Sequence, residues 1–276
     1  MYEIKIKVMS KEKFTRSNVK SSILKKVIIR IDFIGLTDML GCVNSLKTVM
    51  QGKFNKFQPI NNNNYNVELP GKNNLQGINV NLEKRTFYQF TESQIGTNNA
   101  TFMLGTDFAT IEVNCDSRYE GCDEYIKLMA ASIDCILKFD SFISIQRLGL
   151  RKIDVEEFDS VADMDSSLEN HFWNNYKRNQ AYFPLKKTYS DLLYQKDVNT
   201  VFHIERTIQE IEREEQKKYQ YVFDIDSYKN GNLINKDDFS SVSRIEKLIS
   251  EKMNEPVFNY FIDTFTEHYI DTFYNG

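Results

Sequence analysis

Strict alternation of apolar and polar side chains marks the first clear element of the chain. One face of this segment carries Val27, Ile29, Ile31 and Phe33, and the other carries Ile28, Arg30 and Asp32. A period of two residues is typical of a strand with one buried face. The pattern therefore predicts a strand over residues 27–33, which ends at Gly35.

The rest of the first half combines helical spacing with further strand patterns. We expect a short helix that is capped by Thr37, carries apolar residues up to Met50 and ends at Gly52. Strands are predicted over 77–90 and 101–114, with polar loops at 61–64 and 94–99. A long helix is predicted over 122–139, since its apolar residues share one stripe.

The second half repeats this order. The predicted elements are a strand over 142–155, a helix over 166–177, and strands over 188–195, 199–211 and 218–228. Residues 205–218 also fit helical spacing, so both assignments stay open there. Asn230 and Gly231 form a strong hairpin-type turn signal. Helices are predicted over 242–253 and 257–273, with Pro256 in the first turn of the second.

The two halves therefore predict an α+β protein. We expect two similar units, 1–140 and 141–276, each a curved antiparallel sheet with a short helix and a long helix packed on it. The two halves share the order of their predicted elements, but their amino-acid sequences are not similar. The two sheets would join edge to edge or pack through their helices, and we expect one compact unit.

Composition and charge narrow the possible partners. The chain has 276 residues, with 35 basic and 39 acidic side chains and a net charge of −4. Proteins that bind nucleic acid usually carry a basic excess, so nucleic acid is an unlikely partner. Four cysteines without a CxxC pair indicate reduced thiols in a cytoplasmic protein. No apolar run reaches the roughly 20 residues that a membrane span needs.

Two charged strands form the most informative constellation. Arg147, Gly149 and Arg151 share one strand face, and Asp224 and Asp226 share a face of another strand. If the strands lie in one sheet, guanidiniums would meet carboxylates, a pairing that suits the planar fork of arginine. The functional interpretation is a pocket for an anionic ligand or for an acidic side chain of a partner. The alternative is a structural ion-pair network.

Other candidate chemistry is weaker. Glu205 with Asp224 and Asp226 could hold a divalent cation for hydrolysis. His203 alternates with Glu205 on one strand face, which would allow a proton relay, but a histidine packed on the sheet is the simpler interpretation. No catalytic or cofactor motif stands out, so we expect no catalytic residue, metal or cofactor.

Aromatic residues dominate the predicted C-terminal helix. One stripe contains Phe258, Phe261, Phe265 and Tyr269. Core packing is the default explanation of such a stripe. A partner or dimer interface is the alternative, because aromatic residues are enriched at the centres of interfaces.

Three short motifs carry a family resemblance. They are Arg147-Leu-Gly-Leu-Arg-Lys-Ile-Asp154, Tyr221-Val-Phe-Asp-Ile-Asp-Ser-Tyr228, and the ending that begins at Pro256. In this order they resemble a sporadically distributed bacterial and archaeal protein family of about this length, with R-x-G-L-R-x-I-N and L-D-I-D strands. Here Asp154 stands where that family has Asn. The family carries no established activity, so the resemblance implies a fold and not a function. Its sporadic distribution resembles that of mobile defence or toxin–antitoxin loci.

These observations lead to three hypotheses of different kinds. The first is a non-catalytic binding protein that acts on a protein partner or as a homodimer, as a recognition or immunity subunit of a bacterial defence or toxin–antitoxin system. The second is a small-ligand-binding protein with an apolar cavity and Arg147 or Arg151 as its anchor. The third is a hydrolase that uses a metal held by carboxylates.

Overall fold

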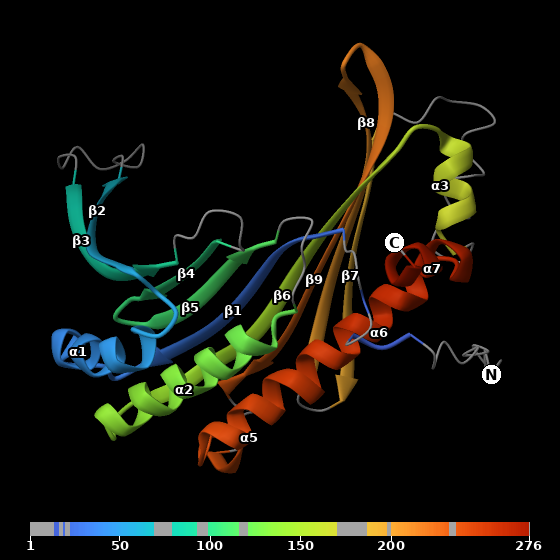
Figure 1. Ribbon diagram of the computed structural model, residues 1–276. Helices are drawn as coiled ribbons and strands as arrows, with labels where there is room; N and C mark the ends of the chain where they lie inside the picture. Colours follow the sequence, from blue (N-terminus) through green and yellow to red (C-terminus); the bar gives the residue numbers. More distant parts are fainter. Residues whose placement is uncertain are drawn as a thin grey trace, which may run out of the picture.

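The computed structural model describes residues 14–16, 19, 23–68, 79–92, 99–115, 121–169, 187–197, 200–231 and 236–275. Its centre is one antiparallel sheet of nine strands in the order β2-β3-β4-β5-β1-β6-β9-β8-β7 (Figure 1). The strands are β1 (Leu24–Ile34), β2 (Lys56–Glu68), β3 (Asn79–Thr91), β4 (Asn99–Leu104), β5 (Phe108–Asn114), β6 (Ser144–Phe158), β7 (Lys187–Asp197), β8 (Thr200–Arg213) and β9 (Gln216–Asn230).

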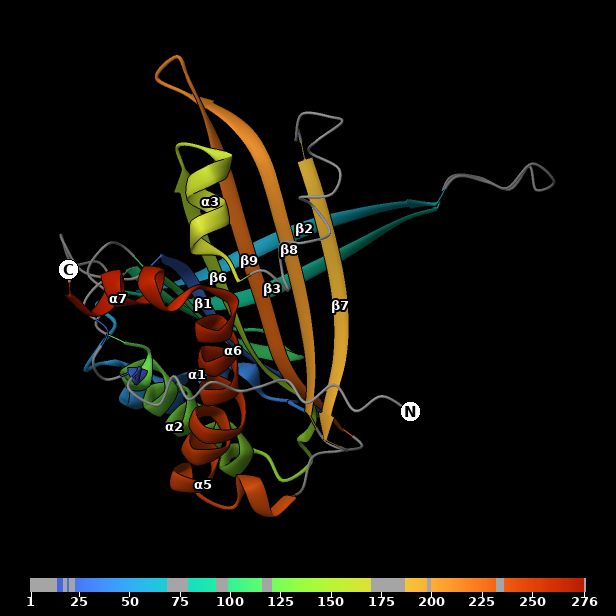
Figure 2. The ribbon, with the colours of Figure 1, turned by 90° about the vertical axis from the view of Figure 1, so that its right-hand side faces the viewer.

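The helices of the described residues gather on one side of this sheet (Figures 1 and 2). They are α1 (Met39–Met50), α2 (Asp123–Phe139), α3 (Val161–Ser167), α5 (Val242–Lys247), α6 (Glu255–Thr264) and α7 (Glu267–Asn275), with the 3-10 turn η3 (Lys236–Phe239) and the π-helical segment η4 (Leu248–Asn254). In Figure 2 they lie to the left of strands β6 to β9, and the opposite face of those strands carries no helix of the described residues.

The alternation in β1 decides which of its side chains enter the core. Val27, Ile29, Ile31 and Phe33 are at most 2% exposed, as expected when one face of a strand packs against helices. The same strand joins the two halves of the chain, because it pairs with β5 on one side and with β6 on the other. The two halves thus share one sheet, joined edge to edge, and the α+β prediction is confirmed. The division at residue 140 remains a prediction.

The predicted strand over 101–114 is two strands. The backbone N–H of Gly105 donates to the carbonyl of Phe108 at 2.8 Å, and a tight turn there separates β4 from β5. The polar run 61–64, predicted to be a loop, lies inside β2. In both places the pairing of neighbouring strands overrides the local conformational preference of the residues. That preference contributes less free energy than a complete ladder of hydrogen bonds.

The ambiguous segment 205–218 is a hairpin rather than a helix. Strands β8 and β9 pair from Val201 and Tyr228 to Arg213 and Gln216. Glu214 and Glu215 form the turn with positive φ angles of 52° and 63°. Asn230 and Gly231 were predicted to form a hairpin turn, but β9 ends there and the next described element is the 3-10 turn η3. The prediction of a hairpin at that position is wrong, because β9 ends at these residues and a 3-10 turn, not a strand, is the next described element.

Helix boundaries also differ from prediction. The carboxylate of Asp38, not Thr37, caps α1 by accepting the N–H of Gly41 at 2.9 Å. The helix predicted over 166–177 lies largely outside the described residues, and α3 begins earlier, at the cap Ser160. Pro256 stands in the first turn of α6 as predicted, but Phe265 is extended and divides α6 from α7.

The long helix α2 agrees with its predicted bounds of 122–139, with Cys122 at its N-cap. Of the helices that the structure describes, none is both long and apolar enough to span a membrane.

Candidate functional site

Strands β6 and β9 are neighbours, and their register brings the predicted charges together. Arg151 lies opposite Asp226, and Asp224 lies opposite Glu205 of β8. All of these side chains project from the face without helices, since the alternate residues of each strand pack on the helical side. The expectation that two guanidiniums meet two carboxylates is confirmed.

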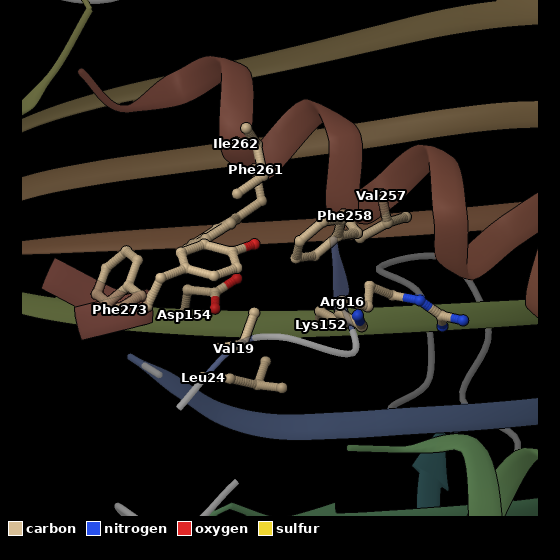
Figure 3. A pocket seen from close by; sticks show the side chains of 11 residues that line it. Arg16, Val19, Leu24, Lys152, Asp154, Val257, Phe258, Phe261, Ile262 and Phe273 are labelled. Atoms are coloured by element: carbon tan, nitrogen blue, oxygen red, sulfur yellow. The ribbon is translucent and has the colours of Figure 1, made fainter. Parts of the chain in front are cut away.

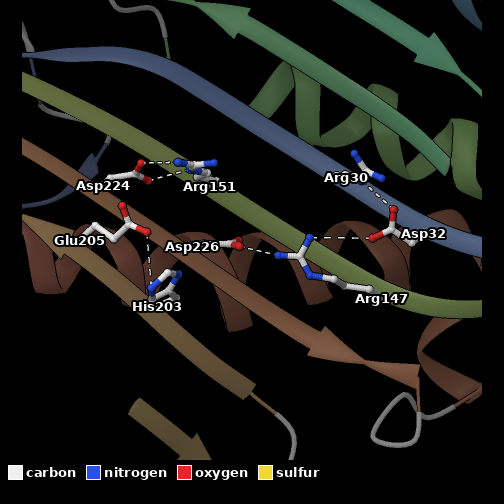
Figure 4. A network of polar contacts seen from close by, with 8 residues as sticks. All are labelled: Arg30, Asp32, Arg147, Arg151, His203, Glu205, Asp224 and Asp226. Atoms are coloured by element: carbon white, nitrogen blue, oxygen red, sulfur yellow. Dashed lines mark hydrogen bonds and ion pairs between the residues drawn. The ribbon is translucent and has the colours of Figure 1, made fainter. Parts of the chain in front are cut away.

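The contacts form separate groups of ion pairs on strands β1, β6, β9 and β8, drawn in Figure 4. Arg151 binds Asp224 through two hydrogen bonds, from Nε at 2.8 Å and from the guanidinium NH2 group at 2.5 Å. Arg147 donates to Asp226 and lies 3.9 Å from Asp32 of β1. We call this set, with Arg30, Asp191, His203 and Glu205, the charged network.

Gly149 leaves room for this arrangement. A Cβ atom at this position would lie 3.4 Å from both the guanidinium of Arg147 and the carboxylate of Asp226. Arg147 therefore extends across the bare backbone of β6 toward Asp226, and its guanidinium also lies 4.7 Å from the ring centre of Tyr228. A Cβ atom at 149 would be in van der Waals contact with both partners.

Burial and pairing shift the pKa values of these groups in opposite directions. Burial raises the pKa of Asp226, and the charges of Arg147 and Arg151 partly offset that increase. The hydrogen bonds from Arg151 to Asp224 raise the pKa of the guanidinium, which stays charged. Arg151 is 44% exposed at its side chain while Asp224 is only 14% exposed, so the carboxylate is the more protected partner.

Three members of the network were not predicted from sequence. Nε2 of His203 lies 2.7 Å from Asp191 of β7 and 3.5 Å from Glu205, so the predicted His203–Glu205 pair has a third partner. Arg30 and Asp32 of β1 are 2.6 Å apart. Arg30 and Asp32 occupy polar positions of the alternating strand β1, and Asp191 lies between Tyr189 and Leu193 on its face of β7. Only the order of the strands places them beside Arg147 and His203.

The carboxylates that the metal hypothesis requires are bound to arginine side chains. Asp224 and Asp226 each bind a guanidinium, which supplies the positive charge that a cation would otherwise provide. In the part of the chain that the structure describes, no cluster of three or more His, Cys, Asp or Glu side chains could hold a metal ion.

The aromatic stripe of the C-terminal helices lies against the sheet. Phe265 is fully buried and Phe258 is 8% exposed, while Phe261 and Tyr269 are partly buried against the core. The rings of Phe265 and Tyr269 stack at 5.2 Å. Core packing accounts for all four positions, and an interface through them would require surface that the chain itself covers.

The face toward the helices carries charges of its own. Lys152 and Asp154 alternate with Arg151 and Ile153 along β6, so they point toward α6 and α7. They line a cavity of about 40 Å³ that Figure 3 shows, together with Arg16 and a set of apolar side chains. Arg147 and Arg151, the anchors expected for a small ligand, do not line it. Neither Lys152 nor Asp154 was among the predicted site residues, although charges at inward positions of a strand are a signal available in the sequence.

Comparisons with protein-family models, with curated proteins and with solved structures found no match to this chain. The resemblance drawn from the three motifs therefore gains no support from them, and no family is assigned. Function has to be argued from the two sides of the sheet alone.

Proposed function

We propose that this chain is a non-catalytic interaction protein that binds a protein partner through the helix-free face of β6 to β9. The single observation that carries the proposal is the charged network, because it places strong polar groups on a face that no described helix covers. A recognition or immunity subunit of a bacterial defence or toxin–antitoxin system, working in the cytoplasm, is the kind of role that we propose for it.

The chemistry of the face favours a basic partner. Five carboxylates face three guanidiniums in the network and at its β7 edge: Asp32, Asp191, Glu205, Asp224 and Asp226 against Arg30, Arg147 and Arg151. The surplus of acid gathers around His203, where two carboxylates share one imidazole. A lysine or arginine of a partner would compensate this surplus, and complementary charge of this kind raises both association rate and specificity.

Apolar side chains stand beside the acidic end of the face. Leu193 and Tyr189 of β7 are 68% and 53% exposed, and they flank Asp191 on the same side of the strand. Exposed large apolar residues next to charge are typical of interaction surfaces, in which an apolar centre is surrounded by polar groups. We therefore propose a partner segment that combines a basic residue with apolar neighbours.

Site-specific photo-crosslinking in the native host tests this function. A photoreactive residue at Leu193 is expected to capture one defined protein, and the same residue at Leu40 of α1, which is 57% exposed on the helical side, is not. Glu205→Lys is expected to abolish the crosslink, since it reverses a charge that the partner contacts. Glu251→Lys, an exposed acidic position in η4, serves as the matched control.

The salt dependence of the captured complex gives a second measurement. Binding that depends on exposed charges weakens as the ionic strength rises, because the screening length falls to roughly 3 Å at 1 M salt. A crosslink from Leu193 that is insensitive to Glu205→Lys, or equal capture from both positions, would contradict the proposal.

A further inference from the structure

The cavity on the helical side of β6 lies between the sheet and the last two helices (Figure 3). Its walls are mostly apolar and come from α6, α7 and the start of β1. They consist of Leu24, Val257, Phe258, Phe261, Ile262, Phe273 and Tyr274. Against these walls stand Lys152 and Asp154 of β6, and Arg16 and Val19 lie on the N-terminal segment. The cavity is therefore an apolar space with charges of both signs.

Both charges of β6 are buried, and each attracts the other. Asp154 is 5% exposed and Lys152 is 6% exposed. Neither side chain makes a hydrogen bond or a close ion pair with another residue of the described chain, and the charges that act on Asp154 are the attraction of Lys152 and the repulsion of Asp224. Buried polar groups are nearly always satisfied in folded proteins, by protein, water or ligand. These two therefore indicate that the cavity holds polar atoms from outside the chain.

The backbone is shaped around this place. The pairing of β1 with β6 shifts its register between Leu24, which faces Asp154, and Lys26, which faces Ile153. Such β-bulges redirect side chains and are common next to binding sites. The N–H of Val155 is nevertheless bonded to the carbonyl of Ile23 at 3.0 Å, so the strand stays fixed on both sides of Asp154.

We propose that this cavity binds a small zwitterion, an α-amino acid of the size of glycine or alanine, with its carboxylate at Lys152 and its ammonium at Asp154. A single ion would satisfy one of these groups and leave the other unpaired. A zwitterion satisfies both, and the apolar walls receive its methyl group. Arg16 is compensated already, because it lies 3.2 Å from both Asp123 and Glu255.

The size of the cavity restricts the ligand. A volume of about 40 Å³ holds roughly three water-sized groups, since each needs about 10–15 Å³ by this measure. Glycine and alanine have five and six non-hydrogen atoms, so either would place about half of its atoms in the cavity, and Arg16 and Val19, which line it, are partly exposed. Larger side chains would have to displace Phe258 or Phe261 from the core.

Titration calorimetry and thermal unfolding of the full chain test the proposal at pH 8. The probes are glycine, L-alanine, L-leucine, acetate and ethylamine. We expect saturable binding of glycine or L-alanine. The affinities for L-leucine, acetate and ethylamine should be lower than this by roughly tenfold or more. Asp154→Asn and Lys152→Met are each expected to weaken the binding of L-alanine by about tenfold or more.

Matched controls separate loss of the site from loss of the fold. Asp107→Asn and Lys127→Met change the same residue types at exposed positions and are expected to leave binding unchanged. Val19→Phe fills part of the cavity without altering a charge, and it is expected to abolish binding while the unliganded unfolding temperature shows that the chain is folded.

Three results would overturn the proposal. One is the absence of saturable binding by glycine and L-alanine, which would mean that water alone fills the cavity. Another is acetate binding as tightly as L-alanine, which would mean an anion site at Lys152. The third is L-alanine binding that persists in folded Asp154→Asn, Lys152→Met and Val19→Phe variants. None of these results bears on the partner-binding face, so the two proposals fail independently.

Discussion

The two faces of strand β6 carry the same kinds of residues with opposite consequences. On the helix-free face, Arg147 and Arg151 pair with Asp226 and Asp224, and each pair keeps some contact with water. On the helical face, one residue away, Lys152 and Asp154 attract each other but are almost completely buried and make no hydrogen bond with another described residue. Alternation along a strand sends neighbouring charges into two different environments.

This difference shows that the pairing of a charge and its burial have separate effects on the stability of the fold. An exposed ion pair contributes little to stability, because water already solvates both charges. A buried charge without a partner opposes folding, and it persists where function requires it or where something else compensates it. Accordingly, burial raises the pKa of Asp154 to about 7. We therefore expect substitutions on the two faces to differ in size and in sign.

The largest effect is expected in the apolar part of the helical face. Phe265 is fully buried, so Phe265→Ala should lower the free energy of unfolding by about 3–5 kcal/mol through lost contacts and a new cavity. Phe142→Ala, at a position that is 82% exposed, should change it by less than about 0.5 kcal/mol. Urea unfolding followed by circular dichroism measures both values. Equal losses would mean that the aromatic stripe does not belong to the core.

The second largest expected effect is the dependence of the free energy of unfolding on pH, which is caused by Asp154. Because its pKa rises from 3.8 to about 7 on folding, the folded chain holds a proton that the unfolded chain has released between those values. The free energy of unfolding therefore falls as the pH rises from about 4 to about 7, by up to about 1.4 kcal/mol per pH unit. Asp154→Asn removes this loss and should be the more stable protein at pH 8, by on the order of 4 kcal/mol.

Unfolding curves for both proteins between pH 4 and pH 8 measure this difference. The two proteins should be nearly equal in stability at the acid end, because pH 4 is close to the unfolded pKa of 3.8 and the difference in bound protons has only begun to act there. Asp107→Asn is the control and should follow the wild-type profile. Parallel profiles for wild type and Asp154→Asn would show that the carboxyl is not in an apolar environment.

The helix-free face should respond much less. Arg151 is 44% exposed, so solvent screens its bond to Asp224, and we expect a coupling energy of about 0.5–1 kcal/mol. A double-mutant cycle with Arg151→Met and Asp224→Asn isolates this value from the other effects of each change. A coupling as large as the effect of Asp154→Asn would remove the contrast between the faces.

The smallest effect is expected at the hairpin between β8 and β9, which belongs to neither face. Glu215 has a φ of 63°, a conformation that glycine adopts more easily than glutamate. Glu215→Gly should raise the free energy of unfolding by about 0.5–1 kcal/mol. Glu212→Gly, within β8, should lower it instead by a similar amount. Destabilisation by both variants would mean that Glu215 gains more from its contacts than it loses in backbone strain.

Local patterns were enough to predict some elements but not their limits. Helix α2 was predicted with nearly its observed bounds, and the strand predicted over 27–33 lies within the longer β1, because each has a regular period and a clear partner face. The β4–β5 hairpin was missed, since its turn at Gly105 lies inside a run that reads as one strand. The turn of two glutamates at 214 and 215 carries none of the residues that usually announce a hairpin.

The sequence by itself determined which residues share a face of each strand, because the period of an extended chain is a local property. It thereby predicted that Arg147 and Arg151 would project together, as would Asp224 and Asp226. Only the tertiary structure decided that β6 lies between β1 and β9, since that order depends on contacts between residues far apart in the chain. The same packing placed Asp191 beside His203 and buried Lys152 and Asp154 beneath α6 and α7. Burial and pairing depend on what the rest of the chain brings near, so no local pattern could supply them.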